Sequence, residues 1–235
     1  MKNPKHETAP HSLTGQRLME MYGLLFERFG PQHWWPGEME TEIMLGAVLA
    51  QNTSWKNVER AILNLKRKGL ISVEALEACD VSVLAEEVRP AGYYNLKARR
   101  VKNLIRMIRQ EFDGDLNRMF HEDPQSLRER LLFVNGIGRE TADSILLYAA
   151  GMPVFVVDGY THRILLRHGM VDEQCTYEEL QSLFMDGLPE SAALFNEFHA
   201  LIVKTGKDLC RKIPRCETCP LQLWGPTSPR ASLPG

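Results

Sequence analysis

The chain has 235 residues, enough for one sizeable core or two small ones, and its formal net charge of −2 gives no overall sign of a polyanionic partner. It contains no run of eighteen apolar residues, and its polar N-terminal stretch lacks the apolar core of a secretory signal. The five cysteines are odd in number and unevenly spaced, which argues against a secreted disulfide framework. We therefore expect a cytoplasmic protein that does not enter a membrane.

Apolar residues recur at helical spacing along most of the chain, and capping residues with glycine or proline stops divide the pattern into segments. Residues 1–12 are polar and are expected to form a disordered tail. One short apolar run, residues 153–157, is extended in character but has no partner strand. The expected helices cover residues 13–29, 42–50, 55–68, 96–112, 124–133, 139–150, 159–168, 177–184 and 191–210, with short helices around Leu76 and Leu84.

The helix expected at residues 96–112 is strongly basic. It carries six basic residues and no acidic one before Glu111, namely Lys97, Arg99, Arg100, Lys102, Arg106 and Arg109. A solvated helix face usually mixes both signs of charge, whereas phosphate neutralisation needs local clusters of this kind. The sequence leaves both interpretations open, a solvent-exposed face or a face turned toward DNA.

Two helical segments flank a tight turn, Val134-Asn135-Gly136-Ile137-Gly138. Its glycines permit positive φ and close backbone approach. Such a turn at a helix start aims unpaired backbone N–H groups outward, where the helix dipole also favours negative charge. We therefore expect an anion site at this turn, with phosphate as its ligand.

Asp158 follows the apolar run 153–157 and precedes the next helix. One interpretation is an ordinary helix N-cap. The other is a functional carboxylate, held between an apolar segment and a helix start, that faces the sugar of a nucleotide bound at the turn.

These segments resemble the helix-hairpin-helix DNA glycosylases of the endonuclease III superfamily. The resemblance is carried by Val134–Ala142 (VNGIGRETA) and Val157–Arg163 (VDGYTHR), and it extends from about Trp34 to Leu221. It implies an all-α, two-lobed fold with the active site in the interlobe cleft. Residues 42–150 would form a helical barrel lobe with the hairpin, and residues 13–41 plus 151–235 the second lobe with a C-terminal cysteine loop.

The resemblance also implies a monomer that acts on double-stranded DNA containing damaged bases, with Asp158 as the catalytic carboxylate. In related enzymes the residue matching Gln51 enters the duplex and fills the space left by the extruded base; a structural role in capping or bridging helices is the alternative. The remaining DNA-binding residues implied are those of the hairpin: Asn135, Gly136, Ile137, Gly138, Arg139 and Thr141.

The chemistry depends on position 140. Bifunctional members of the family carry a Schiff-base lysine immediately after the hairpin arginine, and here that position is Glu140, which cannot form a Schiff base. The resemblance therefore implies a monofunctional glycosylase in which Asp158 promotes attack by water and which needs no cofactor for catalysis.

Three tryptophans suggest the substrate. The strings WWPG, QNTSW and YYNLKA are similar to the 3-methyladenine branch of the superfamily. An alkylated purine is cationic, and an indole attracts a cation by about 0.5–2 kcal/mol. We expect Trp34, Trp35 and Trp55 to form the base pocket, with Trp35 and Trp55 flanking the base.

Cys210, Cys216 and Cys219 are similar to part of the family's iron–sulfur loop. The family has six residues between its first two cysteines and a fourth cysteine further on, whereas this chain has five and no fourth. Three possibilities follow: a structural 4Fe-4S cluster with a non-cysteine ligand, a zinc site completed by another residue, or a relic loop with free thiols.

Two other functions remain open. A bifunctional glycosylase/lyase for oxidised pyrimidines would need another lysine, such as Lys97 or Lys204. A non-catalytic helix-hairpin-helix DNA-binding module would need no carboxylate at Asp158. For His199, a core histidine is expected, and for Tyr93 and Tyr94, packing. The sequence contains neither a zinc-deaminase pattern nor a Walker loop.

Overall fold

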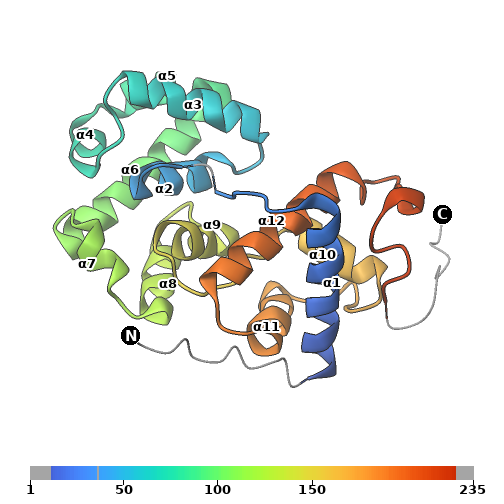
Figure 1. Ribbon diagram of the computed structural model, residues 1–235. Coiled ribbons are helices and arrows are strands. Elements are labelled where there is room, and N and C mark those ends of the chain that lie inside the picture. The colour runs from blue at the N-terminus through green and yellow to red at the C-terminus, as the bar shows by residue number, and fades with distance from the viewer. Residues whose placement is uncertain (1–11, 36, 226–235) are drawn as a thin grey trace, which may run out of the picture. The chain divides into compact units, whose positions relative to one another are not determined.

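The structure is a computed structural model that describes residues 12–35 and 37–225 (Figure 1). Within these ranges it is all-helical and contains no strand, as the sequence predicted. None of the helices in these ranges is long and apolar enough to cross a membrane. The expected tail, residues 1–12, lies outside the described residues except for Ser12, which caps the first helix by accepting a hydrogen bond from the backbone N–H of Gly15.

The chain forms two compact units. Unit 2 comprises residues 35–152, and unit 1 comprises residues 1–34 together with 153–235. The expected boundaries were 41/42 and 150/151, so they differ from the observed ones. The first difference arises because the indole of Trp35 packs on Trp55, with ring centroids 4.8 Å apart, and on Tyr148, at 4.9 Å, and both partners belong to unit 2. The boundary therefore falls between the two adjacent tryptophans.

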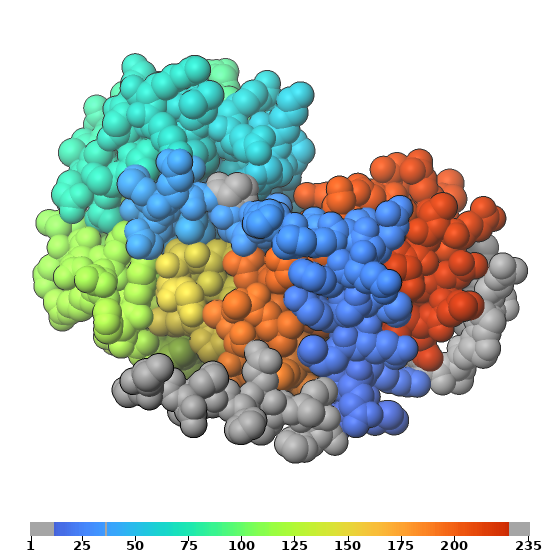
Figure 2. All heavy atoms as spheres, in the orientation of Figure 1, coloured from blue at the N-terminus to red at the C-terminus, as the bar shows by residue number. Residues whose placement is uncertain are grey.

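Unit 2 is built around α2, which contacts α3, α6, α9 and η2. Eight of the ten residues of α2 are buried, and from Ile43 to Leu49 the helix is apolar on all sides. In the space-filling view, α3 to α5 form a continuous outer surface of this unit (Figure 2). Its elements are α2 (Glu40–Leu49), α3 (Trp55–Arg67), α4 (Val73–Ala78), α5 (Val81–Glu87), η1 (Arg89–Ala91), α6 (Tyr94–Phe112), α7 (Leu116–Phe120), α8 (Pro124–Phe133), α9 (Arg139–Ser144) and η2 (Ile145–Ala149).

Two features of unit 2 were not predicted. The short helix α7 follows Asp115, whose side chain accepts a hydrogen bond from the backbone N–H of Arg118. The helix expected over 139–150 changes from α to π geometry at Ile145, and the N–H of Ala150 accordingly donates to the carbonyl of Ile145 at 3.0 Å. A single apolar pattern does not distinguish these two helical forms.

Unit 1 has an aromatic core. The rings of Phe155 and Phe184 stack with centroids 3.8 Å apart, and α12 packs against α1 and α10. Gly206 on α12 permits the close approach of α10, because a Cβ there would lie 2.3 Å from Cδ1 of Tyr160. The elements are α1 (Leu13–Phe29), α10 (Gly159–Arg167), α11 (Tyr177–Gly187), α12 (Ala192–Asp208) and η3 (Cys216–Thr218).

The apolar run before Asp158 is buried and has no strand partner. Side chains of α11 bond its backbone instead. Gln181 Nε2 donates to the carbonyl of Phe155 at 2.7 Å, and the N–H of Phe155 points to the sulfur of Met185 at 3.2 Å. The N–H of Val157 donates to the hydroxyl of Tyr177 at 3.4 Å. Buried backbone groups need such partners, so α11 fixes the segment that ends in Asp158.

Candidate active site

Asp158 is the N-cap of α10. Its Oδ1 accepts hydrogen bonds from the backbone N–H of Thr161, at 2.8 Å, and from the hydroxyl of Thr161, at 2.9 Å. The backbone N–H of Asp158 donates to the same hydroxyl, which completes a capping box. Asp158 therefore does cap α10, as one of the two interpretations of the sequence predicted, but the cap uses only one of its two carboxylate oxygens.

The second carboxylate oxygen faces a histidine. Oδ2 of Asp158 lies 3.7 Å from Nε2 of His199, and both side chains are almost buried, 11% and 7% exposed. Burial alone would raise the pKa of Asp158. The attraction of the nearby His199 imidazole, together with the Thr161 donors, outweighs burial and leaves the pKa of Asp158 below its usual value. Asp158 is therefore a carboxylate, not a carboxylic acid, at neutral pH.

The predicted hairpin is present in unit 2, where α8 and α9 flank the turn 134–138. Arg128 on α8 makes a bidentate ion pair with Asp143 on α9, with Nε–Oδ1 at 2.6 Å and Nη2–Oδ2 at 3.1 Å. The Asp143 side chain is fully buried. This pair fixes the angle between the two helices of the hairpin.

The predicted DNA-binding residues of the hairpin differ in exposure. Asn135, Gly138 and Arg139 are exposed, and Gly136 is half-buried with φ +96°. Ile137 and Thr141 are buried, at 5% and 6% exposed, so they support the turn from inside.

Gln51 is tied to the hairpin. Its Nε2 donates to the carbonyl of Gly136 at 3.1 Å and to the hydroxyl of Thr141 at 2.9 Å, and its Oε1 accepts a hydrogen bond from Nη1 of Arg100. The bridging role that the sequence left as an alternative is thus present in this structure. For Gln51 to enter the duplex, as expected, its side chain must first break these hydrogen bonds, and this role stays a prediction.

The three tryptophans predicted to form the base pocket are divided between the two units. Trp34 belongs to unit 1, where Nζ of Lys207 lies 5.8 Å from its ring centroid. Trp35 and Trp55 belong to unit 2 and meet edge to face, at an interplanar angle of 85°. In this conformation the two rings contact each other, and their expected position on either side of a base stays a prediction.

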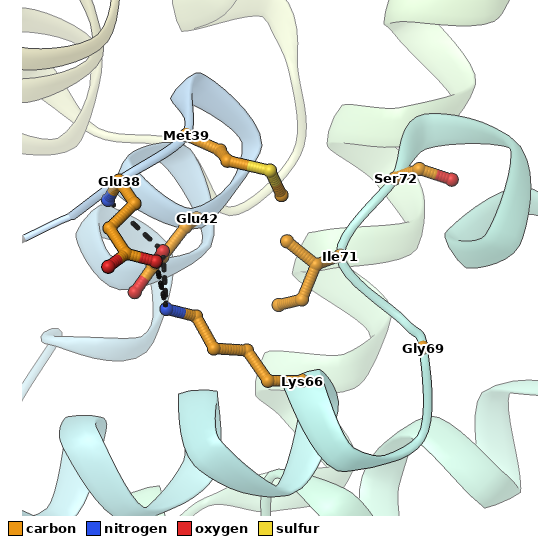
Figure 3. Close-up of a pocket in the computed structure, with 7 residues that line it drawn as sticks. All are labelled: Glu38, Met39, Glu42, Lys66, Gly69, Ile71 and Ser72. Atoms are coloured by element: carbon orange, nitrogen blue, oxygen red, sulfur yellow. Dashed lines mark hydrogen bonds and ion pairs between the residues drawn. The ribbon is translucent and has the colours of Figure 1, made fainter.

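Trp35 and Trp55 do line a cavity of about 280 Å³ within unit 2. The other residues of its wall come from α2 and α3 and include two carboxylates; they are Glu42, Gly46, Glu59, Ile62, Leu63 and Lys66. A neighbouring hollow of about 400 Å³ contains none of the predicted site residues (Figure 3). There Lys66 binds Glu42 at 2.9 Å and Glu38 at 3.4 Å, and Glu42 and Lys66 belong to both cavities.

Of the lysines considered for lyase chemistry, Lys97 is 1% exposed, and its ammonium donates to the carbonyls of Leu49, at 2.8 Å, and Ala91, at 2.7 Å. Lys204 pairs with Asp208 at 2.9 Å on α12. Glu140 is exposed in the first turn of α9.

The basic cluster on α6 acts mainly within unit 2. Besides Lys97, Lys102 donates to the carbonyls of Leu76, Glu77 and Cys79 at 2.7–2.8 Å. Arg109 pairs with Glu77 at 2.8 Å. The helix therefore serves to hold neighbouring loops, a use of basic residues that the sequence pattern did not distinguish from a solvated or DNA-facing surface.

The three C-terminal cysteines differ in burial and in their partners. Cys210 is buried with its sulfur 3.2 Å from Nη1 of Arg167, Cys216 is exposed, and burial raises the pKa of the Cys219 thiol. Within residues 12–35 and 37–225, no group of three or more His, Cys, Asp or Glu side chains is arranged to hold a metal ion.

Other residues hold this loop. Arg167 donates to the carbonyls of Arg211, at 2.6 Å, and Lys212, at 3.1 Å. Arg163 donates to the carbonyl of Cys210 at 2.9 Å, and the indole of Trp224 donates to the carbonyl of Arg17 at 3.2 Å.

Sequence reasoning did not find three features. His199 was expected only as a core residue, and no local pattern reveals its proximity to Asp158. Tyr93, expected to pack, is 72% exposed with φ +45°. Phe133, the last residue of α8, is 91% exposed beside the hairpin. The sequence carries a local signal for only one of these features: the glycine before Tyr93 marks an interruption between helices, where unusual backbone angles are common.

The fold and the site together define an all-helical protein with a helix-hairpin-helix and a buried aspartate at a helix start. Residues 45–190 match the model of the HhH-GPD superfamily base excision DNA repair proteins. The chain is 44% identical to a candidate DNA repair glycosylase of Methanocaldococcus jannaschii, covering 88% of this chain and 94% of that one. It is 30% identical to endonuclease III of Sulfolobus acidocaldarius, covering 75% and 77%.

A solved structure adds to these matches. The H. pylori 3-methyladenine DNA glycosylase bound to 1,N6-ethenoadenine superposes with a TM-score of 0.72 at 33% identity, covering 83% of this chain and 97% of that one. The chain therefore belongs to the HhH-GPD superfamily and is a DNA glycosylase of base excision repair.

Proposed function

We propose that this protein is a monofunctional glycosylase that binds double-stranded DNA, extrudes an alkylated purine such as 3-methyladenine and hydrolyses its N-glycosidic bond. The observation that carries this proposal is the buried, ionised carboxylate of Asp158. As the glycosidic bond breaks, the sugar acquires positive charge, and a fixed carboxylate stabilises that charge and orients the attacking water. The low pKa of Asp158 suits this role and not that of a general acid.

The absence of lyase activity is proposed from the lysines. Position 140 is a glutamate, and the buried ammonium of Lys97 is engaged by two backbone carbonyls. An amine attacks a sugar carbon only when it is deprotonated and can reach that carbon. Lys97 does not meet the second condition, because it is buried and its Nζ is bound by two backbone carbonyls, which supports the water-dependent route.

The substrate class is proposed from the cavity that Trp35 and Trp55 line. Its wall combines two indoles with the carboxylate of Glu59, and both groups attract a cationic purine, whereas Glu42 in the same wall is paired with Lys66 at 2.9 Å. The 33% identical H. pylori protein is a 3-methyladenine DNA glycosylase and was solved with 1,N6-ethenoadenine, a modified purine.

The test is release of free base from duplex DNA carrying 3-methyladenine or 7-methylguanine, with strand breaks scored before and after hot alkali. We expect base release with breaks only after alkali, and no protein–DNA adduct with borohydride. Breaks without alkali, or a trapped adduct, would instead establish the bifunctional endonuclease III-like alternative. Activity confined to oxidised bases would keep the role of Asp158 and reject the substrate class.

The non-catalytic alternative is tested with the same substrates. A pure DNA-binding module releases no base, and its Asp158→Asn variant binds DNA as well as the wild type or more tightly, because one negative charge is lost. We expect base release by the wild type and its loss in the variant.

A further inference from the structure

One face of α6 carries three polar side chains, Lys97, Arg100 and Asn103, spaced three residues apart. Residues at this spacing lie along one side of a helix. Lys97 and Arg100 bond the segment around Gln51, and Asn103 bonds the hairpin turn, so the three side chains reach both segments proposed to contact DNA.

Lys97 holds the turn before Gln51. Its buried ammonium binds the carbonyl of Leu49, at the end of α2, and the carbonyl of Ala91, at the end of η1. The last carbonyls of a helix have no hydrogen-bond donor within the helix, and the ammonium of Lys97 supplies one. Lys97 therefore fixes the end of α2 two residues before Gln51.

Arg100 holds Gln51 itself and contacts the hairpin. Its Nη1 donates to Oε1 of Gln51. Its aliphatic stem lies across Gly136, since a Cβ at position 136 would be 2.3 Å from Cγ of Arg100. Asn103, one turn further along α6, donates to the carbonyl of Asn135 at 3.0 Å.

Gln51 closes the network from the other side, because its Nε2 donates to Gly136 and Thr141 of the hairpin. Both ends of the Gln51 amide are thus engaged, one by α6 and one by the hairpin. The Gln51 turn and the hairpin are separated by 85 residues in sequence, and Arg100 touches both.

We propose that Arg100 is a positioning residue that joins the Gln51 turn and the hairpin into one preorganised DNA-binding surface. This rests on the proposed function, in which both segments meet DNA. Such preorganisation raises the rate of base release, because the two segments are already ordered in the free protein and need not be ordered when DNA binds. Arg100 acts through Gln51 and does not itself touch the reacting atoms.

The first test uses the free, full-length protein. In Arg100→Met, which keeps the stem over Gly136 but loses the bond to Gln51, we expect amide hydrogen exchange to accelerate about tenfold in peptides covering 50–54 and 134–138, as a locally opened segment would. Arg99→Met is the matched control, because Arg99 is exposed on the same helix. Unchanged exchange in Arg100→Met, or an equal change in Arg99→Met, would overturn the proposal.

The second test uses DNA. We expect Arg100→Met to lower the single-turnover rate of base release about tenfold at saturating protein, since small misplacements have effects of this size. Its affinity for undamaged duplex should fall no further than that of Arg99→Met, as each variant loses one positive charge. Arg100→Lys restores that affinity but not the rate, because an ammonium lacks the planar fork that reaches Gln51.

A double-mutant cycle separates coupling from independent effects. The Gln51→Ala/Arg100→Met double variant should release base no more slowly than the slower single variant, whereas multiplicative losses contradict the proposal. If the wild type releases no base from any substrate, the glycosylase proposal fails. Hydrogen exchange in the free protein then still decides whether Arg100 positions Gln51.

Discussion

Oδ2 of Asp158 lies 3.7 Å from Nε2 of His199, while Oδ1 of the same carboxylate caps α10 through Thr161. One oxygen is therefore structural, and the other is directed at an imidazole. This division allows the capping role and the chemical role of Asp158 to be tested separately.

Asp158→Asn separates the two roles. Asparagine is about as good an N-cap as aspartate, so the free energy of unfolding should change by less than about 1 kcal/mol, apart from the lost interaction with His199. Base release should fall at least about a hundredfold, because the charge that stabilises the cationic sugar is gone. Thermal unfolding and single-turnover base release measure the two effects. An active Asp158→Asn variant would show that the aspartate is only a cap.

His199→Phe should change the pH profile. Burial raises the pKa of Asp158, and His199 supplies the largest opposing contribution, so removing the imidazole moves this pKa upward. Because the folded pKa of Asp158 is depressed, its contribution to stability is present above the unfolded pKa and is lost as the pH falls through the folded pKa. In the variant the acid limb of base release should therefore lie at higher pH than in the wild type. If the acid limbs of wild type and variant coincide, His199 does not lower the pKa of Asp158.

Arg128→Ala should destabilise the hairpin. It leaves the fully buried carboxylate of Asp143 unpaired, which costs about 3–5 kcal/mol. Arg130→Ala is the matched control on the same helix, because Arg130 pairs with Glu111 near the surface, where solvent screens the pair and its loss should change stability little. Chemical denaturation of both variants gives the comparison. Equal losses would mean that the buried pair does not hold α8 to α9.

The helices and their caps were predictable because they depend on local sequence. Residues 13–29 form the expected helix with its expected limits, and the short helix expected around Leu76 is α4. The hairpin and the start of α10 at Asp158 also follow from short patterns.

Contacts between distant residues were not predictable. The tie between Gln51 and Thr141 and the contact of Asp158 with His199 join segments 90 and 41 residues apart in the sequence, and both depend on tertiary packing. The edge contact of Trp35 with Trp55 depends on ring orientation, which composition does not specify.

The cysteine loop should not need a metal for stability. Arg163, Arg167 and Trp224 already bond its backbone. A chelator should leave the unfolding temperature of the purified protein unchanged, and elemental analysis should find less than one zinc or iron per chain. Arg167→Ala should lower stability by about 1–3 kcal/mol, because buried or charged hydrogen bonds are lost. Stoichiometric metal, together with a chelator-sensitive unfolding temperature, would show that the three thiols rearrange around an ion.

Lys97→Met should change how the free energy of unfolding depends on pH. Burial, with a smaller contribution from the nearby charge of Arg100, lowers the pKa of Lys97 to about 8. Between about pH 8 and the unfolded pKa of about 10.4, the unfolded chain holds a proton that the folded protein lacks, so wild-type stability gains up to about 1.4 kcal/mol per pH unit. The variant lacks this gain and leaves the carbonyls of Leu49 and Ala91 unsatisfied, at about 1–3 kcal/mol each.

The wild type should therefore exceed the Lys97→Met variant in stability by more at about pH 9.5 than at about pH 7, as measured by chemical denaturation. Lys56→Met, at an exposed position of α3, should stay within about 0.5 kcal/mol of the wild type. A pH-independent difference between wild type and Lys97→Met would contradict the buried, partly neutral state of Lys97.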